Sequence, residues 1–349
     1  MVLHVFNPEH DIALAANLAN FTAPHAGRQL RNDLGVLPAL WVGAGDAVLV
    51  DNMEQAQKVW RRLKYRVGRG DVTFVDKTAL ARMQVSRIEP WGWDLALRAQ
   101  LQRWGIAADL LPDDSQLALI RQLSHRRTAA ALLPQLQMQG TVGQSFECRS
   151  ADEVAALLEQ CRQIVLKAPW SSSGRGVRFL SDGQWSPSVL NWLRNVVSAQ
   201  GSVMVEPCYH RVKDFGMEFE ATDGGIRYLG LSLFHTVNGA YTGNVIATEA
   251  WKREQISRYV SVDLLNAVRE KIVQLLDLGS YRGPFGVDMM ICTEPHDRSY
   301  SLHPCVEINL RRTMGHVALS VTQPDDATVR VMRIKLTDHY RLSVNRVRQ

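Results

Sequence analysis

A lysine followed by a serine- and glycine-rich segment could bind phosphate groups. Lys167 ends an aliphatic run, and Ser171–Gly176, hereafter the Ser/Gly segment, reads SSSGRG. Glycine lets the backbone approach a ligand closely, successive N–H groups can point at phosphate oxygens, and the lysine adds a positive charge. The alternative is an ordinary surface hairpin with a solvated lysine, because glycine-rich loops are common.

Two acids and an amide near the carboxyl end could bind a divalent cation. Asp288 lies within the apolar stretch VDMMI, and Glu307 and Asn309 lie within VEINL. Residues two apart on a strand share a face, so Glu307 and Asn309 point the same way. Carboxylate and amide oxygens suit Mg²⁺, with Mn²⁺ as an alternative, and Mg²⁺ commonly bridges nucleotide phosphates. A solvated hairpin face is the competing interpretation, but polar groups inside apolar strands are costly unless a cation compensates them.

The pattern of apolar residues predicts the elements that position these groups. A strand over 164–166, the Ser/Gly segment and a returning strand over 177–180 form a predicted hairpin. Strands over 283–291 and 305–310 carry the acids and the amide. Further strands are expected over 2–6, 37–42, 47–50, 202–206, 215–221, 226–234 and 240–246, and helices over 187–197 and 262–276. The mixture indicates an α/β (α+β) protein.

The segment Asn7–Asp11 lies between the first predicted strand and an Ala/Leu-rich helix. Polar residues beyond a strand end occupy the position where α/β sheets usually bind ligands, so Glu9, His10 and Asp11 could contact a substrate. We prefer the simpler expectation that Asn7 or Asp11 caps the helix.

The order of these features along residues 124 to 315, with the lysine and the Ser/Gly segment first and the two acids and the amide last, resembles that of the ATP-grasp superfamily, of the ADP-forming carboxylate–amine ligase type. The resemblance implies two α+β subdomains preceded by a Rossmann-like α/β domain. The expected boundaries are 1–115 for the amino-terminal domain, 116–200 for the small subdomain and 201–349 for the large subdomain with its basic tail.

The resemblance also implies site residues. Arg126 (or Arg127) and Lys167 match the cations that hold the nucleotide phosphates, and Asp288, Glu307 and Asn309 match the metal ligands. Arg311 completes the E-x-N-x-R pattern that steadies the transferring phosphoryl group. The remaining nucleotide-binding residues implied are Ser172, Ser173, Gly174, Gly176, Glu206, Cys208 and Asp214, and the catalytic set is Lys167, Arg175 and Arg311.

The implied reaction uses ATP to phosphorylate a carboxylate, after which an amine attacks the acyl phosphate and ADP and phosphate are released. Small-molecule carboxylate and amine substrates, an amino acid or peptide among them, are expected, and the sequence does not identify them. The alternatives are a phosphotransferase (kinase) acting on a hydroxyl group and a non-catalytic ATP-binding module. Side chains considered for the acceptor pocket are Arg312, His316, His235, Asn244 and those of residues 7–11 and 25–28.

Composition sets the remaining expectations. Hydrophobic content of 46% and charged content of 21% are typical of a soluble globular protein, and no apolar run is long enough to cross a bilayer. Five scattered cysteines and an amino terminus unlike a signal peptide predict a cytoplasmic protein with reduced thiols. The net charge of +5 permits an anionic substrate, but no motif supports nucleic-acid binding. The basic tail over 330–348 is expected to be a solvated helix or strand face, and a homodimer is the commonest assembly for such enzymes.

Overall fold

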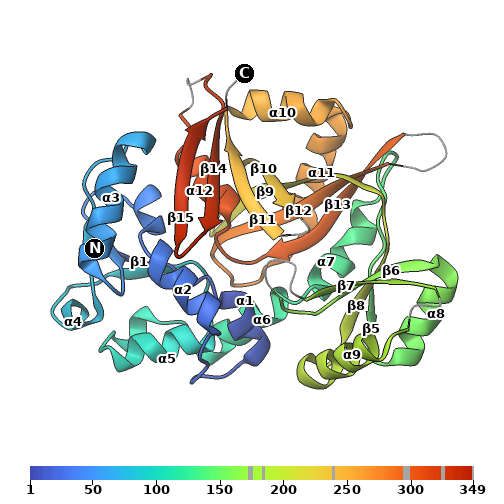
Figure 1. Ribbon diagram of the computed structural model, residues 1–349, viewed down its shortest axis with the longest axis horizontal. Coiled ribbons are helices and arrows are strands. Elements are labelled where there is room, and N and C mark those ends of the chain that lie inside the picture. Colours follow the sequence, from blue (N-terminus) through green and yellow to red (C-terminus); the bar gives the residue numbers. More distant parts are fainter. Residues whose placement is uncertain (172–175, 183–184, 238–239, 294–298, 324–326, 348–349) are drawn as a thin grey trace.

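The computed structural model describes residues 1–171, 176–182, 185–237, 240–293, 299–323 and 327–347. Within these ranges the strands form three sheets. In Figure 1 the amino-terminal unit (blue to cyan) lies on one side of a large sheet (yellow to red), and the small sheet (green) lies on another. No helix of the described residues has both the length and the apolar composition needed to span a bilayer.

The amino-terminal unit is a parallel four-stranded sheet with the order β3-β2-β1-β4, as expected for a Rossmann-like domain. Its strands are β1 (Val2–Val5), β2 (Ala47–Leu49), β3 (Thr73–Val75) and β4 (Arg87–Pro90). Its helices are α1 (His10–Ala16), α2 (His25–Leu34), α3 (Met53–Val67), α4 (Lys77–Leu80) and α5 (Leu95–Arg103), with the 3₁₀ helices η1 (Leu37–Leu40) and η2 (Ala108–Leu110).

The strand predicted over 37–42 is wrong, because this stretch forms the 3₁₀ helix η1. All four residues of η1 are buried, so its sequence is apolar throughout and shows neither a helical nor a strand period. Pro38 has no N–H to donate to a sheet and fits the first turn of a helix.

The small sheet is antiparallel with the order β5-β8-β6-β7. It contains β5 (Phe146–Cys148), β6 (Gln163–Lys167), β7 (Val177–Ser181) and β8 (Val203–Pro207), packed with α8 (Ala151–Cys161) and α9 (Pro187–Gln200). The pairing of Lys167 with Val177 confirms the predicted hairpin. A boundary at residue 200 would separate β8 from its sheet, so we propose that the large subdomain begins after Pro207.

The large sheet has seven strands in the order β13-β12-β9-β10-β11-β14-β15. These are β9 (Arg211–Thr222), β10 (Gly225–Val237), β11 (Ala240–Ile246), β12 (Gly283–Thr293), β13 (Tyr300–Asn309), β14 (Arg330–Leu336) and β15 (Tyr340–Arg346). The associated helices are α6 (Asp114–Leu123), α7 (Arg127–Leu132), η3 (Leu133–Leu136), α10 (Glu249–Ser257), α11 (Val262–Leu275) and α12 (Met314–Ser320).

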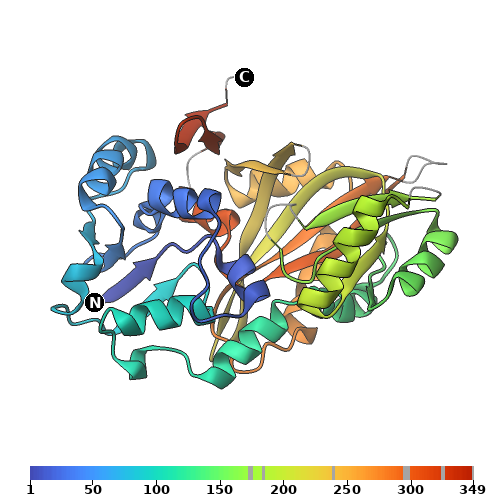
Figure 2. The same cartoon turned by 60° about the horizontal axis from the view of Figure 1, so that its bottom comes forward.

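The two faces of the large sheet differ in character. Phe215, Met217 and Phe219 of β9 point into the main hydrophobic core. The alternate residues Gly216 and Glu218 therefore point to the opposite face, which is the one that carries polar groups. In Figure 2 the large sheet lies between the amino-terminal unit and the small sheet. Residues of both units can therefore lie next to the large sheet.

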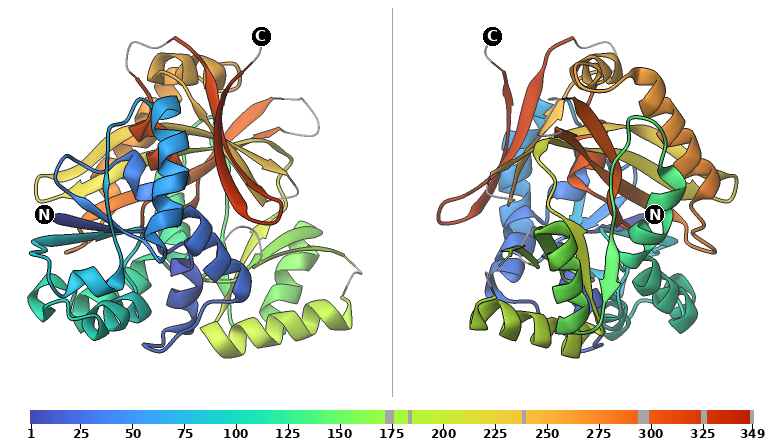
Figure 3. Two further views of the ribbon diagram at one scale, coloured as in Figure 1. Left: turned by 60° about the vertical axis from the view of Figure 1, so that its left-hand side comes forward. Right: turned by 90° about the vertical axis from the view of Figure 1, so that its right-hand side faces the viewer.

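The basic tail forms the hairpin β14–β15, which extends the large sheet. In Figure 3 this red hairpin runs beside the blue helices of the amino-terminal unit, and β15 contacts α2 and α3. Met332 and Val344 are buried in the same core cluster as α3 residues. The tail is therefore a strand hairpin with one buried face, and it is not solvated throughout.

Candidate functional site

The two antiparallel strands β12 and β13 bring the predicted metal ligands together. Asp288 pairs with Glu307 and Gly286 with Asn309 in the strand register. The Asn309 Nδ2 donates a hydrogen bond to Asp288 Oδ2 over 3.1 Å. On the other side of Asp288, Gly216 of β9 keeps the face open, since a Cβ there would lie 3.3 Å from Asp288 Oδ1.

The electrostatics of this group favour a cation. Burial, together with the nearby charges of Glu307 and Glu218, raises the pKa of Asp288 to about 8, and the hydrogen bond from Asn309 opposes this increase only in part. A divalent cation would remove the repulsion that raises this pKa. Among the described residues, no three His, Cys, Asp or Glu side chains are arranged so that they alone could hold a metal ion, so a metal site here depends on the amide oxygen of Asn309. Two carboxylates and an amide oxygen fit Mg²⁺.

Arg126 connects this group to the Ser/Gly segment. Its Nη1 lies 2.8 Å from Glu307 Oε2, and its Nε donates to the Ala168 carbonyl over 3.1 Å. Its Nη2 donates to Ser171 Oγ over 3.4 Å, and the residue is only 9% exposed. The alternative cation, Arg127, is about half exposed and lies 3.4 Å from Glu147 instead. Of the two predicted arginines, it is Arg126 that reaches Glu307.

Lys167 is paired with the acid that the sequence assigned to the nucleotide site. Its Nζ lies 2.5 Å from Glu206 Oε2, and both side chains are buried. Neighbouring β6 and β8 place them side by side. The Cys208 backbone N–H donates a hydrogen bond to the Gln163 carbonyl. Burial raises the pKa of the Cys208 thiol. Because an ammonium has three donors, Lys167 can hold Glu206 and still bind a phosphate oxygen.

Two further nucleotide-site predictions have clear positions. Asp214 accepts hydrogen bonds from Arg211 (3.0 Å) and Thr236 (3.1 Å) and lies two residues from Gly216 on the same strand face. At the base of the Ser/Gly segment, the Gly176 carbonyl accepts from the Ala168 N–H. A Cβ at Gly176 would lie 2.4 Å from the Cβ of Ser171, so only glycine fits there. Ser172, Ser173, Gly174 and Arg175 lie outside the described residues.

Arg311 makes a two-pronged ion pair with Asp11, which lies 300 residues earlier in the chain. The Nε and Nη2 atoms lie 2.9 and 2.8 Å from the two carboxylate oxygens, and Nη2 also donates to Asn309 Oδ1 over 2.9 Å. Burial alone would lower the pKa of Arg311, but the pair with Asp11 raises it overall. Burial would likewise raise the pKa of Asp11, and Arg311 lowers it. The amino-terminal unit thus supplies an acid to the strand end that carries Asn309.

The helix-capping prediction for Asn7 and Asp11 is therefore wrong. The residue at the cap position of α1 is Glu9, and its side chain makes no capping hydrogen bond. Asn7 donates instead to the Gly92 carbonyl (2.8 Å) and to Asp94 (3.1 Å), which ties the end of β1 to the segment after β4. Asp11 lies beyond the cap position in the first turn, where a guanidinium is a stronger partner than a helix N–H.

Sequence reasoning missed Glu218, a buried acid on the same face of β9 as Gly216. Its Oε2 lies 2.9 Å from His316 Nδ1. Cβ atoms at Gly286 and Gly315 would lie 2.6 and 1.8 Å from its carboxylate oxygens, so both glycines make room for it. An acid inside the apolar strand pattern GMEFEA was the available signal, the same one that identified Asp288. His316, which the sequence suggested for an acceptor pocket, closes a capping box with Thr313.

His303 was also missed. It is fully buried on β13, and within the described residues neither ring nitrogen has a hydrogen-bond partner. Burial lowers its pKa to about 4, so the imidazole is neutral at physiological pH. The ring meets the Tyr209 ring edge-on, with centroids 5.5 Å apart. A lone histidine between Leu302 and Pro304 gave no sequence signal of this position.

Comparisons with known proteins identify the fold. No family model matches the sequence, and no curated protein matches it. Among solved structures, the chain is similar to biotin carboxylase from Campylobacter jejuni bound to a β,γ-ATP ligand (TM-score 0.53, 10% identity, 95% of this chain and 75% of that one). It is similar to N5-carboxyaminoimidazole synthetase from Staphylococcus aureus complexed with ADP (TM-score 0.51, 12% identity, 96% and 82%). A putative ATP-grasp superfamily protein from Archaeoglobus fulgidus matches over the full length of both chains (TM-score 0.50, 10% identity). The shared fold is the ATP-grasp fold.

Proposed function

We propose that this chain, which has the ATP-grasp fold, is an ATP-dependent, ADP-forming ligase that joins a carboxylate to an amine through an acyl phosphate. One observation carries the proposal. Two carboxylates and an amide on β12 and β13 lie beside two cationic side chains, Arg126 and Arg311, that come from different parts of the chain. Phosphoryl transfer from ATP needs this kind of charge neutralisation and alignment more than it needs covalent chemistry.

The nucleotide is proposed to lie between the small sheet and the polar face of the large sheet. Lys167 and Arg126 would hold its phosphates, since Arg126 donates to Ser171 at the start of the Ser/Gly segment and Lys167 ends the strand that precedes this segment. The backbone of Glu206–Cys208 is proposed to contact adenine and Asp214 the ribose. Ser172, Ser173, Gly174 and Arg175 remain part of the proposed phosphate site on the basis of sequence alone.

Asp288, Glu307 and Asn309 are proposed to hold Mg²⁺, with Mn²⁺ as an alternative. The bound cation would neutralise charge on the transferring phosphoryl group. Glu307 is shared with Arg126, so the arginine balances the carboxylate before a metal binds. The Asn309 oxygen accepts from Arg311 and has a second lone pair for a metal.

Arg311 is proposed to orient the transferring phosphoryl group or the substrate carboxylate. Asp11 fixes its guanidinium plane through two hydrogen bonds, which limits the directions in which its remaining donors can point. The acyl-phosphate intermediate is labile in water, so the residues that cover the site would also exclude water. Acceptor substrates are proposed to be small carboxylates and amines, amino acids among them.

Phosphorus NMR with Mg²⁺-ATP and a pooled set of small carboxylic acids and amines tests the proposal. We compare wild type, Glu307→Gln and the matched surface variant Glu270→Gln, whose carboxylate is largely exposed. ADP and phosphate that form only with one acid–amine pair, and not in Glu307→Gln, support a ligase. A new phosphoester signal would instead identify a phosphotransferase, and AMP with pyrophosphate would contradict the proposed chemistry.

A further inference from the structure

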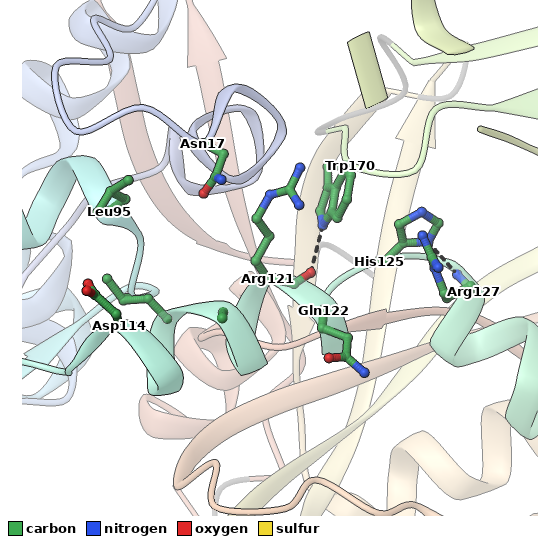
Figure 4. A pocket seen from close by; sticks show the side chains of 10 residues that line it. Asn17, Leu95, Asp114, Arg121, Gln122, His125, Arg127 and Trp170 are labelled. Carbon is green, nitrogen blue, oxygen red and sulfur yellow. Dashed lines mark hydrogen bonds between the residues drawn. The ribbon is translucent and has the colours of Figure 1, made fainter. Parts of the chain in front are cut away.

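A cavity of about 510 Å³ lies between α1, α6 and the residue that precedes the Ser/Gly segment. Figure 4 shows its wall, with Asn17, Arg121 and Trp170 close together and Asp114 at the other end. None of the proposed metal ligands lines it. Its volume is within the range of small-molecule sites, and it lies at the junction of two structural units, where such sites are frequent.

Arg121 is the unusual residue of this cavity. Its guanidinium carbon lies 3.9 Å from the Trp170 ring centroid, and its Nε donates to the Leu14 carbonyl over 2.8 Å. Among the described residues, no carboxylate forms an ion pair with Arg121 and no acceptor is found for its two Nη atoms. A guanidinium stacked on an aromatic ring keeps its in-plane donors available for a planar oxyanion.

The surroundings make this end of the cavity electropositive. Arg127 also lines it and lies 3.4 Å from Glu147, whereas Arg121 forms no ion pair among the described residues. Burial together with the charge of Arg127 lowers the pKa of Arg121. His125 packs edge-on against Trp170, with centroids 4.6 Å apart, and burial lowers its pKa to about 4, so it is neutral and takes no part in the charge balance. At the opposite end, Asp114 is already paired with Arg98 at 2.6 Å. The Arg121 end of the cavity therefore has no anionic group to balance the charge of Arg121 among the described residues.

Part of the cavity wall is apolar, because Leu95, Leu117 and Ala118 line it. The occupant that fits has an oxyanion at the Arg121 end and a short apolar body along these side chains. We propose that this cavity is a binding site, separate from the proposed catalytic site, for a small molecule that carries a carboxylate or phosphate group anchored by Arg121. The inference does not depend on the proposed ligase reaction.

Isothermal titration of the full-length protein with succinate and, separately, with inorganic phosphate tests the site and distinguishes the two anion types. Arg121→Gln should weaken binding of the preferred probe by about ten- to a hundredfold, the usual effect of losing charge-assisted hydrogen bonds. Arg103→Gln is the matched control. Arg103 is exposed in the last turn of α5 and forms no ion pair among the described residues, so its substitution should leave binding unchanged.

Two more variants keep the test decisive. Arg121→Lys retains the charge but loses the planar fork, so it should weaken binding even if Arg121→Gln fails to fold. Lys167→Ala, which alters the proposed phosphate site, should leave succinate binding unchanged. Binding that is lost in Lys167→Ala and retained in Arg121→Gln would place the anion at the proposed nucleotide site and overturn the inference. Failure of wild type to bind either probe at millimolar concentration would overturn it as well.

Discussion

Replacing Asp11 by asparagine tests the contact that joins the amino-terminal unit to the end of β13. The substitution removes the charge from a pair whose two hydrogen bonds are 2.9 and 2.8 Å long. Removing one partner of a buried ion pair costs roughly 3–5 kcal/mol. Arg311 and Asp11 are 16% and 17% exposed, and Arg311 keeps the Asn309 oxygen and the Arg312 carbonyl as acceptors. We therefore expect a smaller loss, about 2–3 kcal/mol.

A double-mutant cycle measures this interaction directly. Urea unfolding of wild type, Asp11→Asn, Arg311→Gln and the double variant should give a coupling energy of about 2 kcal/mol. Asp109→Asn, an exposed acid in η2, controls for the loss of a negative charge in the same unit. In the proposed reaction, Asp11→Asn should lower turnover more than nucleotide affinity, because Arg311 loses its fixed orientation.

Additivity would refute this reasoning. If the two single variants sum to the double variant within about 0.5 kcal/mol, the ion pair contributes nothing measurable. Unchanged turnover in Asp11→Asn, with the coupling energy present, would restrict the pair to a structural role.

Four further predictions address the proposed site. Glu307→Gln and Asp288→Asn should abolish turnover while their circular dichroism spectra stay native, and activity in both variants would contradict the metal assignment. Asp288, with a pKa of about 8, holds its proton at neutral pH, so Mg²⁺ would have to displace that proton. Mg²⁺ affinity, measured by titration calorimetry, should therefore rise about tenfold per pH unit from pH 6 to 8 and level off above pH 8. The Asp288→Asn variant should show no such pH dependence. Lys167→Met should weaken ATP binding by about tenfold or more and destabilise the protein by roughly 3 kcal/mol, since Glu206 is left buried without its cation; adding Glu206→Gln should restore stability in chemical unfolding but not ATP affinity. Folding lowers the pKa of His303 to about 4 from an unfolded value near 6.5, so the unfolded chain binds the proton more readily. The free energy of unfolding should therefore fall by roughly 3 kcal/mol as the pH drops from about 6.5 to 4. In thermal unfolding, His303→Phe should depend less steeply on acid pH than wild type.

Much of the architecture follows from local patterns in the sequence. The aliphatic run before Lys167 and the returning strand predicted the β6–β7 hairpin, because strand periodicity and a Ser/Gly connection are properties of neighbouring residues. The alternation in VEINL likewise predicted that Glu307 and Asn309 share a face. Ile308, between them, points into the hydrophobic core, whereas Glu307 and Asn309 point to the polar face. This two-residue alternation is a property of the strand itself and holds in whatever sheet the strand joins.

The tertiary structure alone decided which groups meet on that face. The sequence shows no relation between Asp11 and Arg311, 300 residues apart, and the capping expectation failed because a cation from the last third of the chain competes for the carboxylate. The stretch of η1 is apolar because it is buried all round, so it carries no periodic signal of its conformation. Glu218 and the Arg121 cavity also depend on packing, since two glycines on other elements make room for the acid and Trp170 stacks on the arginine. Local periodicity determines which way a side chain points, whereas its partners depend on contacts between distant segments, and those form only when the whole chain is folded.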